Sequence, residues 1–291
     1  MSAPSRWVLG ARPRTLPAAV VPVAVGTAVA VGQGSGLSWW RAGAALVVSL
    51  ALQVATNYVN DYADGARGVD TGRVGPVRLV GSGLATVGQV KRAALAAFAV
   101  AGVAGLALAL AVGPELLVVG AVCMAAGWAY TGGPHPYAYR GLGEVFVFTF
   151  FGVVATVGST YVLLERVSAL AVAASVPVGL ASVALLVVNN LRDIPTDRAG
   201  GKRTLAVRLG DHGTRLLYQA VVAGVLIGVL ALAVSRPPAL VGLVGAVAWW
   251  PALRAVRGGA TGAALIPVLG ATGRAQLVTG LALAAGLALG G

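Results

Sequence analysis

Runs of about 20 mostly apolar residues recur along this chain, and they constrain its fold more than any other feature. A segment of that length crosses the hydrocarbon core of a bilayer as an α-helix, because lipid offers no hydrogen bonds to a bare backbone. The composition agrees, since 58% of the 291 residues are hydrophobic and 10% are charged, whereas a soluble domain has about 25% charged residues. The sequence therefore predicts an all-α, polytopic membrane protein.

Nine such segments are expected to form one bundle, and residues 1–291 are expected to be a single domain. The expected ranges are 17–33, 41–62, 90–112, 116–131, 144–164, 167–191, 215–234, 238–253 and 275–290. If the N-terminus is cytoplasmic, the inner loops hold all 21 Lys and Arg residues except Arg41, Arg166 and Arg236. Basic residues collect in cytoplasmic loops. The net charge of +12 therefore indicates orientation in a plasma membrane, with the N-terminus inside, and not nucleic-acid binding.

Polar and acidic residues are scarce, but they gather at the ends of two apolar segments. The first group is Gln53, Asn57, Asn60, Asp61 and Asp64, and the second is Asn189, Asn190, Asp193 and Asp197. Within each group the steps are mostly three or four residues, which places the side chains on one face of a helix. The loops of 65–89 and 192–214 are expected to follow them. Polar groups at membrane depth are costly and usually functional, so both groups are candidate sites at the cytoplasmic face.

Carboxylates in two clusters suit a hard divalent cation such as Mg²⁺, which is typically held by a few carboxylates together with substrate phosphates. Basic residues surround the clusters in sequence: Arg67, Arg73, Arg78, Lys91, Arg92, Lys202, Arg203 and Arg208. Carboxylates for a metal, interleaved with cations for phosphate, predict a site for a metal-bound diphosphate. The plain alternative is that each Asp pairs with a neighbouring Arg on a solvated helix end.

Five motifs in order carry a family resemblance. They are RPxTLP from Arg12, NDYxDG from Asn60, RxGPxR from Arg73, PYxYxGLGE from Pro136, and NNLRDxxxD from Asn189 with the GKxTLxVRLG that follows from Gly201. Together they resemble the UbiA superfamily of intramembrane aromatic prenyltransferases, in particular its 1,4-dihydroxy-2-naphthoate branch. The spacing of Asp64 and Asp70 is six residues, which is longer than in much of the superfamily, and Asp70 is not counted among the expected metal ligands.

The resemblance implies transfer of a polyprenyl group from polyprenyl diphosphate to 1,4-dihydroxy-2-naphthoate, with loss of CO₂, in menaquinone biosynthesis. It implies Mg²⁺ as cofactor and the lipid bilayer as surroundings. The expected metal ligands are Asp61, Asp64, Asp193 and Asp197. The expected catalytic residues are Asn57, Lys91, Tyr139 and again Asp193. The expected substrate-binding residues are Arg12, Arg14, Arg67, Arg78, Tyr130, Asn190, Lys202 and Arg203.

Several readings stay open at this level. A sibling enzyme would use another acceptor, such as 4-hydroxybenzoate or homogentisate. A transporter would place its polar residues near the midplane, and a scaffold would leave the acidic clusters unexplained. Glu144 either caps a helix start or faces a substrate. Phe146, Phe148, Phe150 and Phe151 are expected to be ordinary packing residues rather than partners of a carbocation.

Overall fold

The structure is a computed structural model that describes residues 3–68 and 75–289. Every regular element in these ranges is helical. The helices are α1 (Ala3–Ala11), η1 (Pro13–Thr15), α2 (Pro17–Val31), α3 (Trp39–Ala66), α4 (Val87–Val112), α5 (Glu115–Ala129), η2 (Tyr137–Arg140), α6 (Gly143–Val147), η3 (Phe148–Val154), α7 (Ala155–Leu164), α8 (Ala169–Ala199), α9 (Leu205–Ser235), η4 (Pro237–Val244), α10 (Gly245–Arg257), η5 (Gly262–Ala264) and α11 (Leu265–Ala288).

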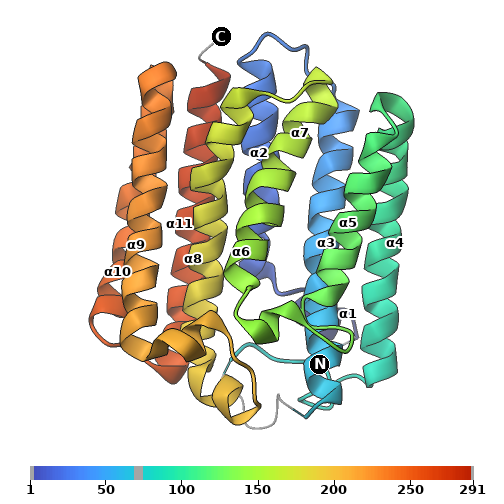
Figure 1. Cartoon of the computed structure of the whole chain (residues 1–291), viewed down its shortest axis with the longest axis vertical. Helices are drawn as coiled ribbons and strands as arrows, with labels where there is room; N and C mark the ends of the chain where they lie inside the picture. The colour runs from blue at the N-terminus through green and yellow to red at the C-terminus, as the bar shows by residue number, and fades with distance from the viewer. Residues whose placement is uncertain (1–2, 69–74, 290–291) are drawn as a thin grey trace.

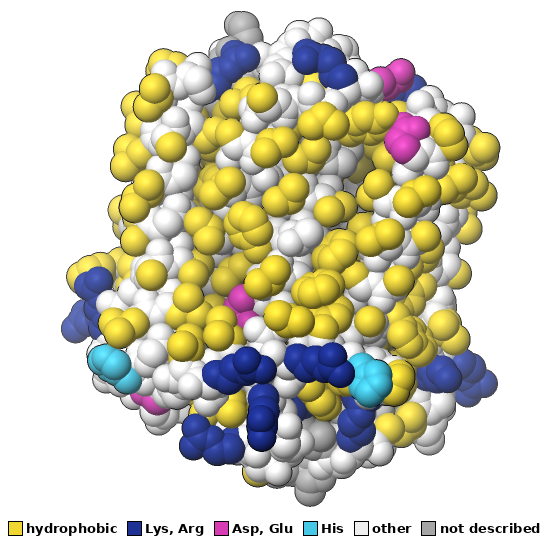
Figure 2. Space-filling model, viewed as in Figure 1, with side chains coloured by type: hydrophobic (Ala, Val, Ile, Leu, Met, Phe, Trp, Pro, Cys, Tyr) yellow, Lys and Arg dark blue, Asp and Glu magenta, His cyan; other side chains and the backbone are white. Residues whose placement is uncertain are grey.

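The long helices stand side by side with nearly parallel axes, and the chain ends lie at opposite ends of the bundle (Figure 1). The segments that join α3 to α4, α5 to α6 and α8 to α9 all lie at the lower end in that view. Figure 2 shows hydrophobic side chains over the middle of this face, while most of the Lys and Arg side chains lie toward the lower end. An apolar middle with polar ends is what a bilayer requires of a helical bundle.

Seven of the described helical stretches are long and apolar enough to cross a membrane, and an eighth joins them if the bent pair Arg6–Thr15 and Pro17–Val31 is one span. The apolar helix Glu115–Ala129 is shorter. Each of the nine expected segments therefore corresponds to a helix in the part of the chain that is described. The number of crossings and the cytoplasmic N-terminus remain predictions.

The expected loop of 192–214 is wrong for most of its length. Helix α8 continues through Pro195 to Ala199, and α9 already begins at Leu205. Thr204 caps α9 by accepting a hydrogen bond from the backbone N–H of Val207, as Ser and Thr commonly do at helix starts. Both Asp193 and Asp197 therefore lie within a helix, one turn apart on the same face.

Two glycines let the central helices approach closely. A Cβ built on Gly152 would lie 2.5 Å from the Cα of Gly179, and one built on Gly179 would lie 2.7 Å from Cδ2 of Phe148. Small residues at such crossings are typical of helices packed in membranes, where association depends on close van der Waals contact. The contact presses η3, a π-helical segment, against α8 and fixes one wall of the site.

Candidate active site

A small polar compartment of about 40 Å³ lies at the lower end of the bundle. The last turns of α3 and α8, the segment between α5 and α6, and the turn before α9 supply its walls. Its polar lining residues include Asn60, Arg78, Tyr130, Tyr139, Glu144, Asn189, Asn190, Asp193, Asp197 and Lys202. Residues more than 100 positions apart in sequence therefore meet at one place. Both polar groups that the sequence singled out contribute to it.

Asp64 lies beside this compartment and bonds to two residues that line it. It is fully buried. It accepts a hydrogen bond of 2.6 Å from the hydroxyl of Tyr139 and one of 2.7 Å from Nζ of Lys202, and Nη2 of Arg78 lies 3.6 Å away. A buried charge is stable only when it is paired and hydrogen-bonded, so these partners hold the carboxylate ionised and in one orientation.

Asp193 and Asp197 of α8 form the second carboxylate pair. Asp193 accepts two bonds of 2.8 Å from Nε and Nη2 of the adjacent Arg192. Asp197 lies 3.8 Å from the Lys202 ammonium. Lys202 thus stands between Asp64 and Asp197, and it joins the acidic residues of α3 to those of α8.

Asp61 has a different environment from the other three aspartates. Its Oδ2 accepts a bond of 2.7 Å from the backbone N–H of Leu79, and its Oδ1 accepts one of 3.1 Å from that of Val80. Like Asp64, the Asp61 side chain is fully buried and is not among the residues that line the polar compartment. The segment held in this way begins with Arg78, whose Nη1 donates to Oδ1 of Asn60 at 3.1 Å. A metal role for Asp61 stays a prediction, whereas its bonds to this segment are direct.

Tyr139 presents an aromatic face to two cations while its hydroxyl bonds to Asp64. The Lys202 ammonium lies 4.8 Å from the ring centroid and the Arg67 guanidinium 5.2 Å. Burial of the hydroxyl, reinforced by the Asp64 carboxylate, raises the pKa of Tyr139 above its ordinary value. The hydroxyl therefore stays protonated and keeps donating to Asp64 at neutral pH.

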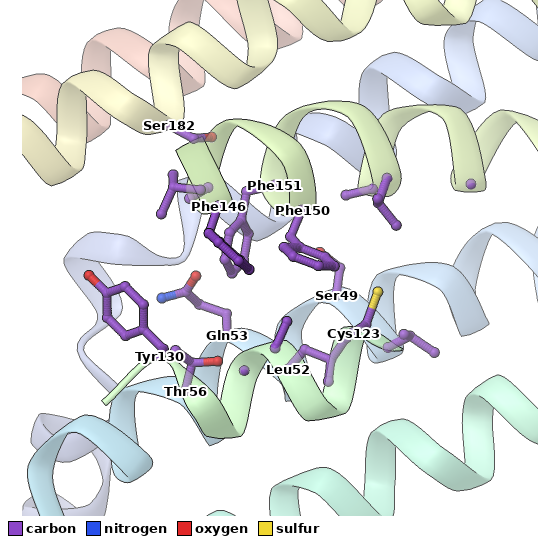
Figure 3. Close-up of a pocket in the computed structure, with 18 of the residues that line it drawn as sticks. Ser49, Leu52, Gln53, Thr56, Cys123, Tyr130, Phe146, Phe150, Phe151 and Ser182 are labelled. Carbon is purple, nitrogen blue, oxygen red and sulfur yellow. The ribbon is translucent and has the colours of Figure 1, made fainter. Parts of the chain in front are cut away.

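A larger, mostly apolar cavity of about 250 Å³ lies inside the bundle next to the polar compartment. Asn60, Tyr130 and Asn189 line both spaces, so the two are continuous in their walls. Figure 3 shows Gln53, Thr56 and Tyr130 near one end of the cavity, Phe146, Phe150 and Phe151 over its middle with Leu52 opposite them, and Cys123 farther along. The apolar cavity thus begins directly beside the charged residues of the polar compartment.

Three of the four phenylalanines line the cavity, contrary to the expectation that they only pack. Phe148 alone turns toward Gly179 of α8. Phe146 and Phe150 are four residues apart and share a helix face, and the wider π-helical turn of η3 brings Phe151 to the same face. Phe146 also stacks on Tyr137 with ring centroids 3.8 Å apart. The aromatic wall therefore continues from the cavity to the segment that carries Tyr139.

Asn57 and Arg12 connect the N-terminal segment to the cavity wall. Nδ2 of Asn57 donates to the carbonyl of Ala11 at 2.9 Å and to the Thr15 hydroxyl at 3.1 Å. Arg12, which adopts a left-handed backbone conformation with φ 53°, lines the same cavity. Asn57 thus fixes the turn that presents Arg12, and a direct catalytic role for Asn57 remains a prediction.

Four expected site residues stand apart from the polar compartment. Arg14, Lys91 and Arg203 are exposed, and Lys91 lies 6.0 Å from the centroid of the Trp128 ring. Arg67 lies at the rim, where its guanidinium donates to the carbonyls of Thr131 and Gly133 at 2.7 Å. Spacing along the chain placed these cations near the site but did not reveal where long side chains point.

Some expectations fall outside the described residues, and some lining residues were missed. Asp70 and Arg73 belong to 69–74, which the structure does not describe. Thr196 and Thr204 line the polar compartment without having been singled out in the sequence. Asn60 and Asn189 line it as members of the two polar groups, although neither had been assigned an individual role. Spacing identified Asn60 and Asn189, because each precedes a motif aspartate by four residues and so shares its helix face.

The donor set of the compartment is suited to a hard cation. Within residues 3–68 and 75–289, no group of three or more His, Cys, Asp or Glu side chains could by itself hold a metal ion. The available donors are carboxylate, amide and hydroxyl oxygens. Mg²⁺ prefers such ligands, and one or two carboxylates suffice when substrate phosphates and water complete its shell. The residues present therefore fit a Mg²⁺ that binds together with a diphosphate.

Comparison with known proteins settles the family. The model of the UbiA prenyltransferase family matches residues 19–265. The chain belongs to this family. It is 52% identical to a 1,4-dihydroxy-2-naphthoate octaprenyltransferase of Mycobacterium tuberculosis, over 100% of this chain and 99% of that protein.

Solved structures of UbiA homologues share the fold. One from Aeropyrum pernix superposes with a TM-score of 0.70 at 16% identity and covers 92% of this chain and 96% of its own. Another, from Archaeoglobus fulgidus and bound to GPP and Mg²⁺, gives a TM-score of 0.67 at 15% identity over 96% of this chain and 99% of its own. At such identities the likeness establishes the UbiA fold of this chain, and the site must be argued from its own residues.

Proposed function

We propose that this protein transfers a polyprenyl group from polyprenyl diphosphate to 1,4-dihydroxy-2-naphthoate, with loss of the carboxylate as CO₂, in menaquinone synthesis. The observation that carries the proposal is full-length similarity, at 52% identity, to a protein named for prenyl transfer to this acceptor. The paired polar compartment and apolar cavity support it physically, because one substrate has a charged head and a long apolar chain.

The polar compartment would hold the diphosphate. Asp64, Asp193 and Asp197 would hold Mg²⁺, which neutralises the diphosphate and stabilises it as a leaving group. Lys202 and Arg78 are both buried at this compartment. They would add positive charge close to the phosphate oxygens, where low dielectric strengthens the attraction. Exposed Arg203, Lys91 and Arg14, together with Arg67 at the rim, would act mainly by attracting the anionic substrates.

The apolar cavity would hold the reacting end of the prenyl chain. When the bond to diphosphate breaks, its electron pair leaves with the diphosphate and an allylic cation remains. The faces of aromatic rings attract cations, and Phe146, Phe150 and Tyr130 line this space. Exclusion of water from the cavity would protect the cation from hydrolysis.

The acceptor would meet the cation where the two spaces join. The electron-rich ring carbon that bears the carboxylate forms the new bond to the prenyl carbon. Breaking the bond to the carboxylate then returns an electron pair to the ring, restores aromaticity and releases CO₂. No ring proton has to be removed by a base, and this suits a site whose carboxylates are already paired with cations. Arg12 lines the cavity and would attract the acceptor carboxylate.

The test is turnover by the purified protein in detergent or liposomes, with one labelled polyprenyl diphosphate and a panel of aromatic acceptors. The proposal expects prenylated product and diphosphate release with 1,4-dihydroxy-2-naphthoate and Mg²⁺, and neither when EDTA removes the metal. A preference for 4-hydroxybenzoate or homogentisate would move the protein to a sibling activity. Movement of an intact substrate across the liposome membrane without diphosphate release would identify a transporter.

The membrane placement is proposed with it. The charge distribution over the expected loops favours a cytoplasmic N-terminus in the plasma membrane, and therefore a site that opens to the cytoplasm. Water-soluble substrates made inside the cell would then reach the polar compartment directly.

A further inference from the structure

Among the described residues, Glu144 is the one carboxylate on the wall of the polar compartment that lies outside both aspartate motifs. It is the second residue of α6 and only 8% exposed. A left-handed Gly141, with φ 74°, directs the chain into this helix. The carboxylate is close enough to Tyr130 to add to the effect of burial in raising the pKa of that phenol. Since Tyr130 lines both spaces, Glu144 stands near their junction.

The two oxygens of this carboxylate are not equivalent. Oε1 accepts a hydrogen bond of 3.0 Å from Nδ2 of Asn190 on α8. Oε2 is buried, and no donor among the described residues reaches it. Buried polar atoms are nearly always hydrogen-bonded, so an exception calls for a ligand or another explanation. A glutamine at this position could accept the bond from Asn190 equally well, so that bond does not account for the charge.

The chemistry of the substrates decides what reaches Oε2. An ionised carboxylate oxygen accepts hydrogen bonds and cannot donate them. An ionised diphosphate likewise has acceptors only, and a prenyl chain has neither donors nor acceptors. The dihydroxynaphthoate carries two O–H groups, which are the only donors that either substrate brings.

We propose that Oε2 of Glu144 accepts a hydrogen bond from a ring hydroxyl of the acceptor, and that this bond sets the orientation of the ring at the junction. The inference rests on the proposed function. A phenol that donates to a carboxylate gains electron density in its ring, so the same bond also favours attack on the allylic cation. The proton stays in the hydrogen bond between the ring hydroxyl and Oε2, so no proton transfer to Glu144 is required. Glu144 is thus a residue that distinguishes a hydroxylated acceptor from a ring without that group.

The test is a thermodynamic cycle in which the Glu144 side chain and the hydroxyl of the bound ring are changed separately and together. Glu144→Gln is compared with the wild type for binding of three competitive inhibitors of the acceptor. These are a non-reactive dihydroxynaphthoate analogue and the two naphthoates that lack one or the other hydroxyl. Losing a hydrogen bond to a charged group typically weakens binding by about 10- to 100-fold. The affinity of the wild type for the inhibitor should fall by that factor when one particular hydroxyl is absent. The affinity of Glu144→Gln should change little when the same hydroxyl is removed.

The kinetic constants give a second readout. Glu144→Gln should raise the KM of the acceptor by about 10- to 100-fold and leave the KM of polyprenyl diphosphate and the Mg²⁺ requirement unchanged. Glu144→Asp, which keeps the charge, should restore part of the loss. The matched control is Glu115→Gln at the opposite end of the bundle, where the carboxylate is exposed and bonded to Tyr161. It should change neither KM.

Each outcome bears on the inference. Additive losses in the cycle, or equal changes in both KM values, would overturn it while leaving the activity established. A raised Mg²⁺ requirement in Glu144→Gln would make Glu144 a metal ligand and also overturn it. Failure of the wild type to prenylate the naphthoate would instead overturn the proposed function. If Glu144→Gln does not fold, as judged by thermal unfolding, the same cycle is run with Glu144→Asp.

Discussion

Substitution of Asp61 tests whether this residue binds Mg²⁺ or positions the segment that carries Arg78. In the sequence Asp61 belongs to the acidic cluster and is expected to ligate Mg²⁺. In the structure both of its carboxylate oxygens accept backbone N–H groups, from Leu79 and Val80. The segment fixed in this way carries Arg78, which reaches Asn60 and Asp64. Asp61 is therefore expected to act through Arg78.

The magnitude follows from those two bonds. Asp61→Asn keeps one acceptor oxygen but turns an NH₂ group toward the second backbone N–H. Leaving one buried donor unsatisfied costs about 1 to 3 kcal/mol, and Asp61→Ala, which leaves both, should cost about 2 to 6 kcal/mol. The second bond is partly buried, so the upper end of that range is a limit.

The assay combines thermal unfolding in detergent with titration of turnover by Mg²⁺. Asp61→Asn should unfold at a lower temperature and turn over more slowly, and its half-maximal Mg²⁺ concentration should equal that of the wild type. Asp197→Asn is the comparison, because Asp197 lines the polar compartment and its loss should raise the Mg²⁺ requirement. An Asp61→Asn protein with wild-type stability and a raised Mg²⁺ requirement would refute this reasoning and restore Asp61 as a metal ligand.

Three further predictions concern the site, the packing and the topology. Tyr139→Phe removes the 2.6 Å bond to a buried carboxylate and should lower kcat/KM by about tenfold or more; because burial raises the Tyr139 pKa above 10.0, the wild-type pH profile should show no tyrosine step below that pH. Gly179→Ala places a Cβ 2.7 Å from a phenylalanine ring of η3 and should destabilise the protein by about 1 to 3 kcal/mol, whereas Gly102→Ala, with no atom within 4 Å, should not, as thermal unfolding will show. Single cysteines at the exposed positions Ser82 and Gly200, with the native cysteine replaced by alanine, should react with an impermeant thiol reagent only from the cytoplasmic side; reaction of either from outside alone would contradict the orientation.

The helices and the location of the candidate site could be predicted from the sequence because both depend on local periodicity. Apolar runs gave all the long helices, and polar residues at steps of three or four identified the faces of α3 and α8 that carry Asp64, Asp193 and Asp197. Nothing local indicated that α8 would continue through Pro195, because its last turns are stabilised by distant parts of the chain, through the bond from Asn190 to Glu144 and the packing of Ile194 in the core.

The individual roles of side chains could not be predicted, because they depend on tertiary neighbours. Lys91 and Lys202 both follow an acidic cluster in the sequence, yet Lys91 is exposed and Lys202 is buried against Asp64. Asp61 and Asp64 lie three residues apart, yet they bind different groups. The four phenylalanines of residues 146–151 were assigned to packing, whereas three of them line the cavity. The π-helical turn of η3 adds Phe151 to the face that Phe146 and Phe150 share.

The fate of the acceptor carboxylate tests most directly whether prenyl transfer is coupled to loss of CO₂. The purified protein is given 1,4-dihydroxy-2-naphthoate labelled in its carboxyl carbon, together with polyprenyl diphosphate labelled in its chain, and both products are followed over time. One labelled CO₂ is expected for each prenyl group transferred, released in step with the prenylated ring. Prenylated product that retains the carboxyl label, or CO₂ released without prenyl transfer, would contradict this coupling.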